Sequence, residues 1–125
     1  MQEFNTDAFF AEFSRVWNDH DLDGIIEQFA EDGVYEASFG PDIVGGRAVG
    51  HVAIRTLLNE TFKRVSDLAF EDRFFHYSNG VAIVEGTQKG TMPDGTKFET
   101  ACVDILIIKD GKLAAKRAYR KDHGS

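Results

Sequence analysis

The chain has 125 residues, 42% of them hydrophobic, which is enough for one domain whose core needs no disulfide or structural metal. The formal net charge of −7 and the absence of a basic stripe argue against a nucleic-acid partner, because phosphate neutralisation dominates nucleic-acid affinity. No stretch approaches the ~18 apolar residues of a membrane span, and residues 1–5 have no basic region. We therefore expect a cytoplasmic protein that has no signal peptide and does not bind a membrane.

The first half of the chain has mostly helical periodicity. Aromatic and aliphatic residues recur every three or four positions over about 9–17, which predicts an amphipathic helix that Asn5 or Thr6 can cap. Asp21 is expected to cap a short second helix, which an aspartate–glycine pair at 32–33 ends. The elements expected next are a strand over 34–39, a glycine-rich loop, and a third helix over about 49–64.

The second half has the pattern of an antiparallel meander. An asparagine–glycine pair at 79–80 predicts a tight hairpin, and aspartate–glycine pairs at 94–95 and 110–111 predict two more turns. These turns separate four predicted strands, over 68–77, 81–91, 98–108 and 113–120. Helices that cover one side of an antiparallel sheet define an α+β domain.

The predicted strand over 98–108 is apolar on both of its faces. An antiparallel strand normally has one face in water, and the helices can cover only one face of the sheet. The simplest cover for the other face, which carries Ala101, Val103, Ile105 and Ile107, is a second subunit. The sequence therefore predicts a homodimer through the outer sheet face.

Several short segments, taken in order, resemble one known family. They are WNDHDLDG at 17–24, FAEDGVY at 29–35, GHVAIR at 50–55 and, in the final hairpin, VDI at 103–105, DGK at 110–112 and RAY at 117–119. Together they resemble the SnoaL-like proteins of the nuclear-transport-factor-2-like superfamily. The resemblance covers nearly the whole chain, which we take as a single SnoaL-like domain over residues 1–125.

This resemblance implies a curved antiparallel sheet that three helices wrap into a cone around an internal pocket. Many members of the superfamily are homodimers through the outer sheet face. The members include polyketide cyclases, ketosteroid isomerases, dehydratases, epoxide hydrolases and proteins without known activity, so the fold does not fix the function.

Asp104 is the sharpest candidate for chemistry, because it is the one charged residue deep within an apolar strand. A carboxylate is costly to bury unless it is paired or hydrogen-bonded. Its position resembles that of the aspartic acid with which ketosteroid isomerases donate a hydrogen bond to the substrate oxyanion. The alternative is a structural carboxylate bonded to Lys116, Arg120 or a backbone amide.

Two mechanisms of the superfamily do not fit this sequence. The general base of ketosteroid isomerases would fall at Ala37 and their oxyanion-hole tyrosine at Phe13, and neither side chain can exchange a proton. The epoxide hydrolases carry an arginine and a second aspartate at positions that correspond to Cys102 and Ala118. Neither steroid isomerisation nor epoxide hydrolysis by these mechanisms is therefore expected.

Lys116 and Arg120, on the last predicted strand, share the face of Asp104 if that residue points inward. A cation at the mouth of a pocket could bind a carboxylate or an enolate. Alternatively, both cations lie at a solvated end of the sheet, which is the interpretation that their residue types favour. Tyr35 either orients a ligand oxygen or packs in the core.

The other candidates for a ligand pocket are mostly apolar or aromatic: Phe13, Trp17, Ala37, Leu58, Phe62, His76 and Cys102. We expect His20 and His123 on the surface and His51 at a helix end. No spacing of histidine, cysteine or acidic residues fits zinc or calcium, and no nucleotide motif is present. We therefore expect neither a metal nor a cofactor.

Two classes of function fit these residues. The first is a small-molecule-binding acid–base enzyme of the isomerase, cyclase or dehydratase type, with Asp104 as the proton carrier and a mostly apolar carbonyl compound as the substrate. The second is a non-catalytic dimeric domain that binds a ligand or another protein. The isolated Asp104 favours the enzyme, and the missing base at Ala37 favours the second class.

Overall fold

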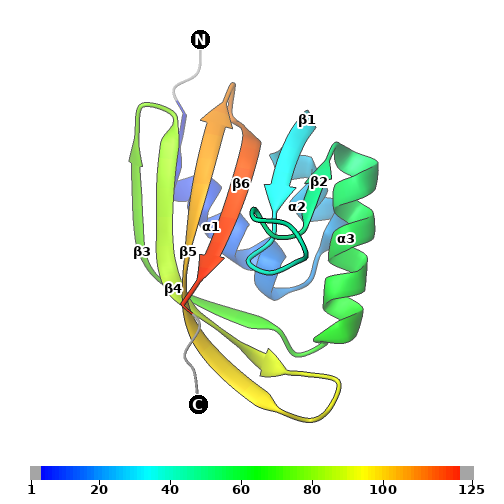
Figure 1. Cartoon of the computed structure of the whole chain (residues 1–125). Coiled ribbons are helices and arrows are strands. Elements are labelled where there is room, and N and C mark those ends of the chain that lie inside the picture. The colour runs from blue at the N-terminus through cyan, green and yellow to red at the C-terminus, as the bar shows by residue number, and fades with distance from the viewer. Residues whose placement is uncertain (1–3, 122–125) are drawn as a thin grey trace.

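The fold was analysed in a computed structural model that describes residues 4–121, so that His123 lies outside the described residues. Its helices are α1 (Thr6–Asn18), α2 (Leu22–Gln28) and α3 (His51–Arg64). The strands are β1 (Phe29–Glu36), β2 (Arg47–Val49), β3 (Ala69–Ser78), β4 (Val81–Thr91), β5 (Lys97–Lys109) and β6 (Lys112–Arg120). They form one sheet in the order β2-β1-β6-β5-β4-β3, which confirms the predicted α+β class (Figure 1).

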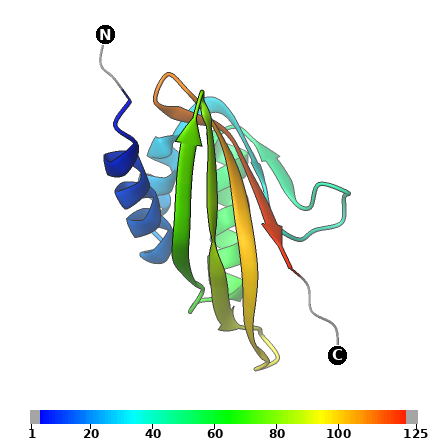
Figure 2. The same cartoon turned by 90° about the vertical axis from the view of Figure 1, so that its left-hand side faces the viewer.

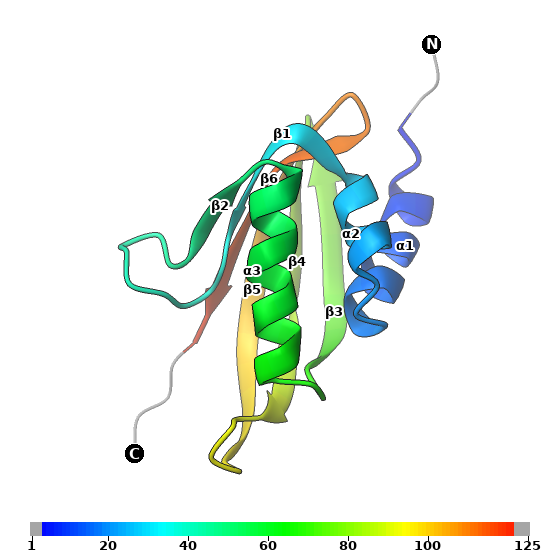
Figure 3. The same cartoon turned by 90° about the vertical axis from the view of Figure 1, so that its right-hand side faces the viewer.

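The sheet is strongly twisted, and all three helices lie against its concave side (Figure 3). No helix covers the opposite side in the part of the chain described (Figure 2). The C-terminal end of β4 and the N-terminal end of β5 bend beneath the C-terminal end of α3 (Figure 1). The core between these layers is aliphatic and aromatic, with Val16, Ile25, Ile54, Leu58, Leu106 and Leu113 fully buried. Among residues 4–121, no helix is both long and apolar enough to cross a bilayer.

The sheet is mixed, whereas an entirely antiparallel sheet was expected. β1 runs parallel to β6, with Tyr35 opposite Lys116, because α3 and the meander lie between the two strands in the chain. β1 also begins at Phe29 rather than Val34, and its register shifts between these two residues. A Cβ at Gly33 would lie 2.9 Å from the Leu113 carbonyl oxygen, so the aspartate–glycine pair at 32–33 marks an irregularity inside a strand.

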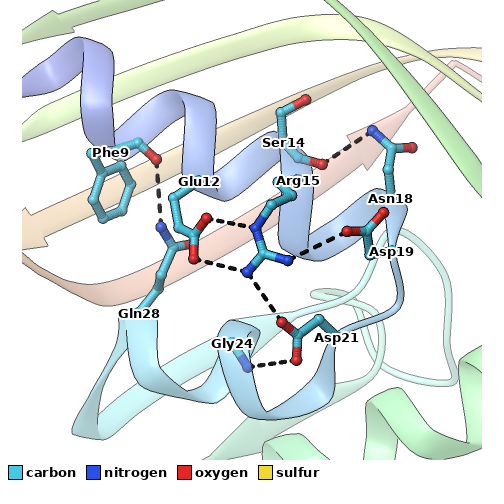
Figure 4. Close-up of polar contacts among 9 residues, drawn as sticks. All are labelled: Phe9, Glu12, Ser14, Arg15, Asn18, Asp19, Asp21, Gly24 and Gln28. Atoms are coloured by element: carbon cyan, nitrogen blue, oxygen red, sulfur yellow. Dashed lines mark hydrogen bonds and ion pairs between the residues drawn. The ribbon is translucent and has the colours of Figure 1, made fainter.

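Helices α1 and α2 begin at the predicted N-cap residues, Asn5 and Asp21. Asn5 Oδ1 accepts a hydrogen bond from the Ala8 N–H (2.9 Å), and Asp21 Oδ1 accepts one from the Gly24 N–H (3.0 Å). The guanidinium of Arg15 joins the two helices at the surface by contacting Glu12, Asp19 and Asp21 (Figure 4). These pairs are exposed and therefore stabilise the fold only slightly.

The turn after α1 attaches that helix to the start of β3. Asn18 Oδ1 accepts a hydrogen bond from the Phe70 N–H (2.8 Å), and His20 Nε2 donates to the Leu68 carbonyl oxygen (2.6 Å). The His20 ring also stacks on Phe62, with 4.0 Å between ring centres. The expectation that His20 lies on the surface is therefore wrong, because its ring is half-buried between α3 and the entry to the sheet.

We predict that Gly86→Ala destabilises the fold through an irregularity in β3. The register of the β3–β4 pair shifts between Asp72 and Phe74, next to Gly86, where an added Cβ would overlap the Glu71 carbonyl oxygen. The free energy of unfolding in urea should fall by about 1–3 kcal/mol. Gly46→Ala is the control, because a Cβ there has no neighbour nearer than 3.5 Å. Equal stability of Gly86→Ala and the parent would contradict this account.

Candidate functional site

An apolar, partly enclosed cavity of about 190 Å³ lies between the concave face of the sheet and the helices. Benzene fits a cavity of about 150 Å³, so this one suits a compound of one or two rings. Its polar or aromatic lining comes from α1, α3, β1, β3, β4, β5 and β6, and includes Trp17, Tyr35, Phe70, Cys102, Asp104, Lys116 and Arg120. The candidate site is therefore assembled mainly on the sheet, with further contacts from α1 and α3.

A buried ion pair lies in the wall of this cavity. Lys116 Nζ donates a hydrogen bond to Asp104 Oδ1 at 3.3 Å, and the two side chains are only 3% and 13% exposed. In the β5–β6 register Asp104 lies opposite Ala118, and Lys116 lies opposite Leu106, which puts both charges on the inner face. The interpretation that Lys116 lies at a solvated end of the sheet is therefore wrong.

Three aromatic rings surround the ammonium group of Lys116. Its Nζ lies 4.2 Å from the ring centre of Trp17, 5.0 Å from that of Tyr35 and 6.0 Å from that of Phe13. Cation–π attraction thus replaces part of the lost hydration. Burial acts to lower the pKa of Lys116. The negative charge of Asp104 acts in the opposite direction, together with smaller contributions from other neighbours, and the net result is a pKa above its ordinary value. Lys116 is therefore a permanent cation at neutral pH.

Tyr35 contributes a neutral hydroxyl beside this pair. Burial raises the pKa of its phenol, with the charge of Lys116 acting in the opposite direction and that of Asp104 in the same direction. The phenol consequently stays protonated at neutral pH and can donate a hydrogen bond to an oxygen of a bound molecule.

A second carboxyl group, Asp72 on β3, was missed by the sequence analysis. It lines a small cavity of about 10 Å³ together with Asp104 and Lys116. Burial raises its pKa and the charge of Asp104 adds to the rise, while a hydrogen bond with Ser14 and the charge of Lys116 oppose it. A carboxyl group whose pKa is raised by burial therefore lines the same small cavity as the ion pair.

The register shift in β3 explains both this omission and a misplaced histidine. Before the shift the even-numbered Phe70 and Asp72 face inward, and after it the odd-numbered Phe75 and Tyr77 do so. His76 is consequently exposed and stacks with Phe74 outside the cavity. The prediction that His76 lines the pocket is wrong.

The structure brings most of the predicted site residues together. The large cavity is lined by Trp17, Tyr35, Ala37, Cys102, Asp104, Lys116 and Arg120, and Phe13 lines the small one. Leu58 and Phe62 are not in the lining of either cavity, because they face the core, so their assignment to the pocket is also wrong. Thr61, Arg64 and Val65 of the same segment reach the large cavity instead.

Two further polar residues have defined places. Arg120 lies at the cavity's exposed end, with its guanidinium 5.3 Å from the ring centre of Phe39. His51, at the start of α3, donates from Nε2 to the Phe29 carbonyl oxygen at 2.9 Å. Within residues 4–121 no three histidine, cysteine or acidic side chains are grouped as metal ligands would be.

The sequence matches a known family of proteins. The SnoaL-like domain matches residues 10–116, and the chain belongs to the SnoaL-like domain family. No curated protein matches the chain.

Solved structures with the same fold include three whose sequence identity is low, so they establish the fold alone. A nuclear-transport-factor-2-like protein of unknown function from Burkholderia pseudomallei is 18% identical, with a TM-score of 0.81 over 92% of this chain and 89% of that chain. TerC, co-crystallised with polyporic acid, is 20% identical, with a TM-score of 0.79 over 92% and 90% of the two chains. A protein with a ketosteroid isomerase-like fold from Catenulispora acidiphila, in complex with trimethylamine, is 15% identical, with a TM-score of 0.80 over 92% and 86%.

We predict that Cys102 is a slow nucleophile in the folded protein. Burial, followed by the charge of Asp104, raises the pKa of its thiol from 9.0 to about 11. Because the thiolate is the reactive form, the reactive fraction at neutral pH should be lower by about 100-fold than in an ordinary thiol. Alkylation by iodoacetamide should therefore be much slower in the folded protein than in the same chain in urea. Equal rates in the two states would show that the thiol is not perturbed.

Proposed function

We propose that this SnoaL-like chain is a cytoplasmic, cofactor-independent homodimer that binds a small, mostly apolar carbonyl compound and acts on it by acid–base chemistry of the isomerase, cyclase or dehydratase type. The observation that carries the proposal is the buried Asp104–Lys116 ion pair in the wall of an apolar cavity. Apolar walls favour an apolar ligand, and they strengthen the electrostatic effect of the pair on any oxygen that replaces water there.

Each polar side chain has a role in the proposed reaction. Asp104, which is ion-paired with Lys116, accepts a proton from the carbon next to the carbonyl group. The electron pair moves to the carbonyl oxygen, where the ammonium of Lys116 and the hydroxyl of Tyr35 stabilise the negative charge. Asp104 can then return the proton to another carbon, which completes an isomerisation.

Two structural neighbours support a small-molecule ligand. TerC was co-crystallised with polyporic acid, and the ketosteroid isomerase-like protein is in complex with trimethylamine. Both molecules are small organic compounds, and this chain encloses an apolar cavity of about 190 Å³.

A second candidate function, ligand binding without catalysis, is favoured by Ala37. This residue lines the cavity on the β1 side and provides no proton acceptor there. The two functions differ in a measurable way, because a binding domain would hold a ketone without exchanging its protons.

We predict that Asp104→Asn abolishes proton exchange without unfolding the protein. Aromatic ketones such as acetophenone would first be screened for binding by ligand-observed NMR. Exchange of the protons next to the carbonyl group in deuterated water should then fall at least about 100-fold in the variant, because general-base catalysis contributes that much. Asp110→Asn, in the exposed turn before β6, is the matched control. If the parent binds ketones and exchanges no protons, the non-catalytic function is correct.

We predict that Ile105→Lys dissociates the proposed homodimer. The outer sheet face carries exposed apolar side chains, among them Phe74 (52% exposed), Ile83 (39%) and Tyr119 (50%), around the half-buried Ile105. A charge in the middle of this face would disfavour its burial against a second copy. Light scattering at micromolar concentration should report the dimer mass for the parent and half of it for the variant.

The control for this experiment is Val52→Lys. Val52 lies on α3 and is already 83% exposed, so a lysine there should leave the mass unchanged. A monomeric parent protein would overturn the homodimer, and an unaffected Ile105→Lys dimer would place the interface elsewhere.

A further inference from the structure

A small cavity, which we call the inner chamber, adjoins the large one. The inner chamber has a volume of about 10 Å³ and is lined by Phe13, Trp17, Phe70, Asp72, Asp104 and Lys116. Trp17, Phe70, Asp104 and Lys116 also line the large cavity, so these four side chains form the boundary between the two spaces. A molecule in the inner chamber would therefore lie next to a ligand in the large cavity.

The size and polarity of the inner chamber fit a single water molecule. A buried water needs about 10–15 Å³ and between about two and four polar partners. Apolar voids of this size stay dry, but the inner chamber has a carboxyl group from β3, a carboxylate from β5 and an ammonium group from β6. Within residues 4–121, Lys116 Nζ donates one hydrogen bond, to Asp104, so its other N–H groups can donate to a water molecule.

The indole of Trp17 provides an independent indication of a bound oxygen. Trp17 is only 4% exposed, and its Nε1 has no hydrogen-bond acceptor in the described part of the chain. A buried N–H group without an acceptor is costly. An oxygen atom bound at the inner chamber, which Trp17 lines, would supply the acceptor.

The two carboxyl groups of the inner chamber have different surroundings. Asp104 is ion-paired with Lys116, whereas burial and the neighbouring charge of Asp104 raise the pKa of Asp72. A carboxyl group with a raised pKa and an ion-paired carboxyl group thus face one small space. Two carboxyl groups whose environments differ in this way can divide the acid and base roles of one reaction.

We propose that the inner chamber binds one water molecule among Asp72, Asp104, Lys116 and Trp17, and that this water is the reactant of a hydration or the leaving group of a dehydration in the adjoining cavity. The binding of water stands by itself, whereas the reaction rests on the proposed function. Asp72 becomes the second catalytic residue, and the substrate class becomes a β-hydroxy ketone or the corresponding enone.

The atoms of this reaction balance without a cofactor. In the dehydration, Asp104 removes the proton from the carbon next to the carbonyl group, and that electron pair forms the carbon–carbon double bond. The bond between the β-carbon and its hydroxyl oxygen breaks, and Asp72 gives its proton to the hydroxyl group, which leaves as water in the inner chamber. Hydration is the same sequence in reverse: Asp72 takes a proton from the attacking water and Asp104 gives one to the carbon next to the carbonyl group. In either direction a proton then passes between the two carboxyl groups through water in the inner chamber, which restores their starting states.

The water site can be tested in the protein without a ligand. A high-resolution crystal structure should show an oxygen within hydrogen-bond distance of Trp17 Nε1 and a carboxylate. Because Trp17 is the single tryptophan of the chain, its indole N–H proton gives an unambiguous NMR signal, which should show a cross-relaxation peak to water. Asp72→Leu should abolish both observations, and Glu71→Leu, at the exposed neighbouring position, should leave them unchanged. A dry chamber in the parent protein overturns the water site.

The reaction can be tested separately with the enone benzylideneacetone in ¹⁸O-labelled water. The parent protein should incorporate ¹⁸O at the β-carbon, and Asp72→Asn should lower the rate at least about 100-fold. The same variant should still exchange the protons next to the carbonyl group of a bound ketone, since that step uses Asp104. Proton exchange without ¹⁸O incorporation in the parent overturns the hydration reaction and leaves the proposed function intact. Failure of both reactions overturns the proposed function, and the water site is then judged by the crystal structure alone.

Discussion

The ion pair between Lys116 and Asp104 is the interaction on which the rest of the site depends. Removing an ammonium group and a carboxylate from water is costly, and the pair is tolerated only where geometry and further partners compensate. The β5–β6 register supplies the geometry by directing both side chains inward. Trp17 from α1 and Tyr35 from β1 supply the aromatic partners of the cation. The residues that make the pair tolerable are thus the same residues that form the cavity wall.

The position of Trp17 in turn depends on a short polar segment at the end of α1. Asn18 and His20 attach the segment to the entry of β3, and Asp21 caps α2 while also contacting Arg15. None of these residues reaches the ligand cavity, but each restricts how α1 can lie over the sheet. These contacts explain why a run of polar residues follows the buried Trp17: they hold the end of α1 in place against β3 and α2.

The sequence predicted the faces of β5 and β6 correctly because strict alternation holds there through the site. Asp104 and Lys116 share a face for that reason, and no register shift lies between Cys102 and Ile107. In β3 the alternation breaks between Asp72 and Phe74, which reverses the faces of all later residues. Simple counting therefore could not place both Asp72 and His76 correctly. The available signal lay in the partner strand, where Gly86 permits the close approach of the β3 backbone.

The burial of Lys116 could not be predicted from strand alternation either, because lysine side chains usually lie in water. What decides its place is the sum of neighbours that only the folded chain brings together: one carboxylate and three rings. Such a pair is a poor device for stability, since apolar residues of similar volume often serve a core equally well. It does give the cavity wall a buried ammonium group beside a carboxyl group. A ligand oxygen that approaches this charge meets a cation that has lost most of its hydration, so its field acts on the ligand with little screening by bulk water. An ammonium group in this position can stabilise negative charge that develops on a ligand oxygen, which is what the proposed proton abstraction next to a carbonyl group requires.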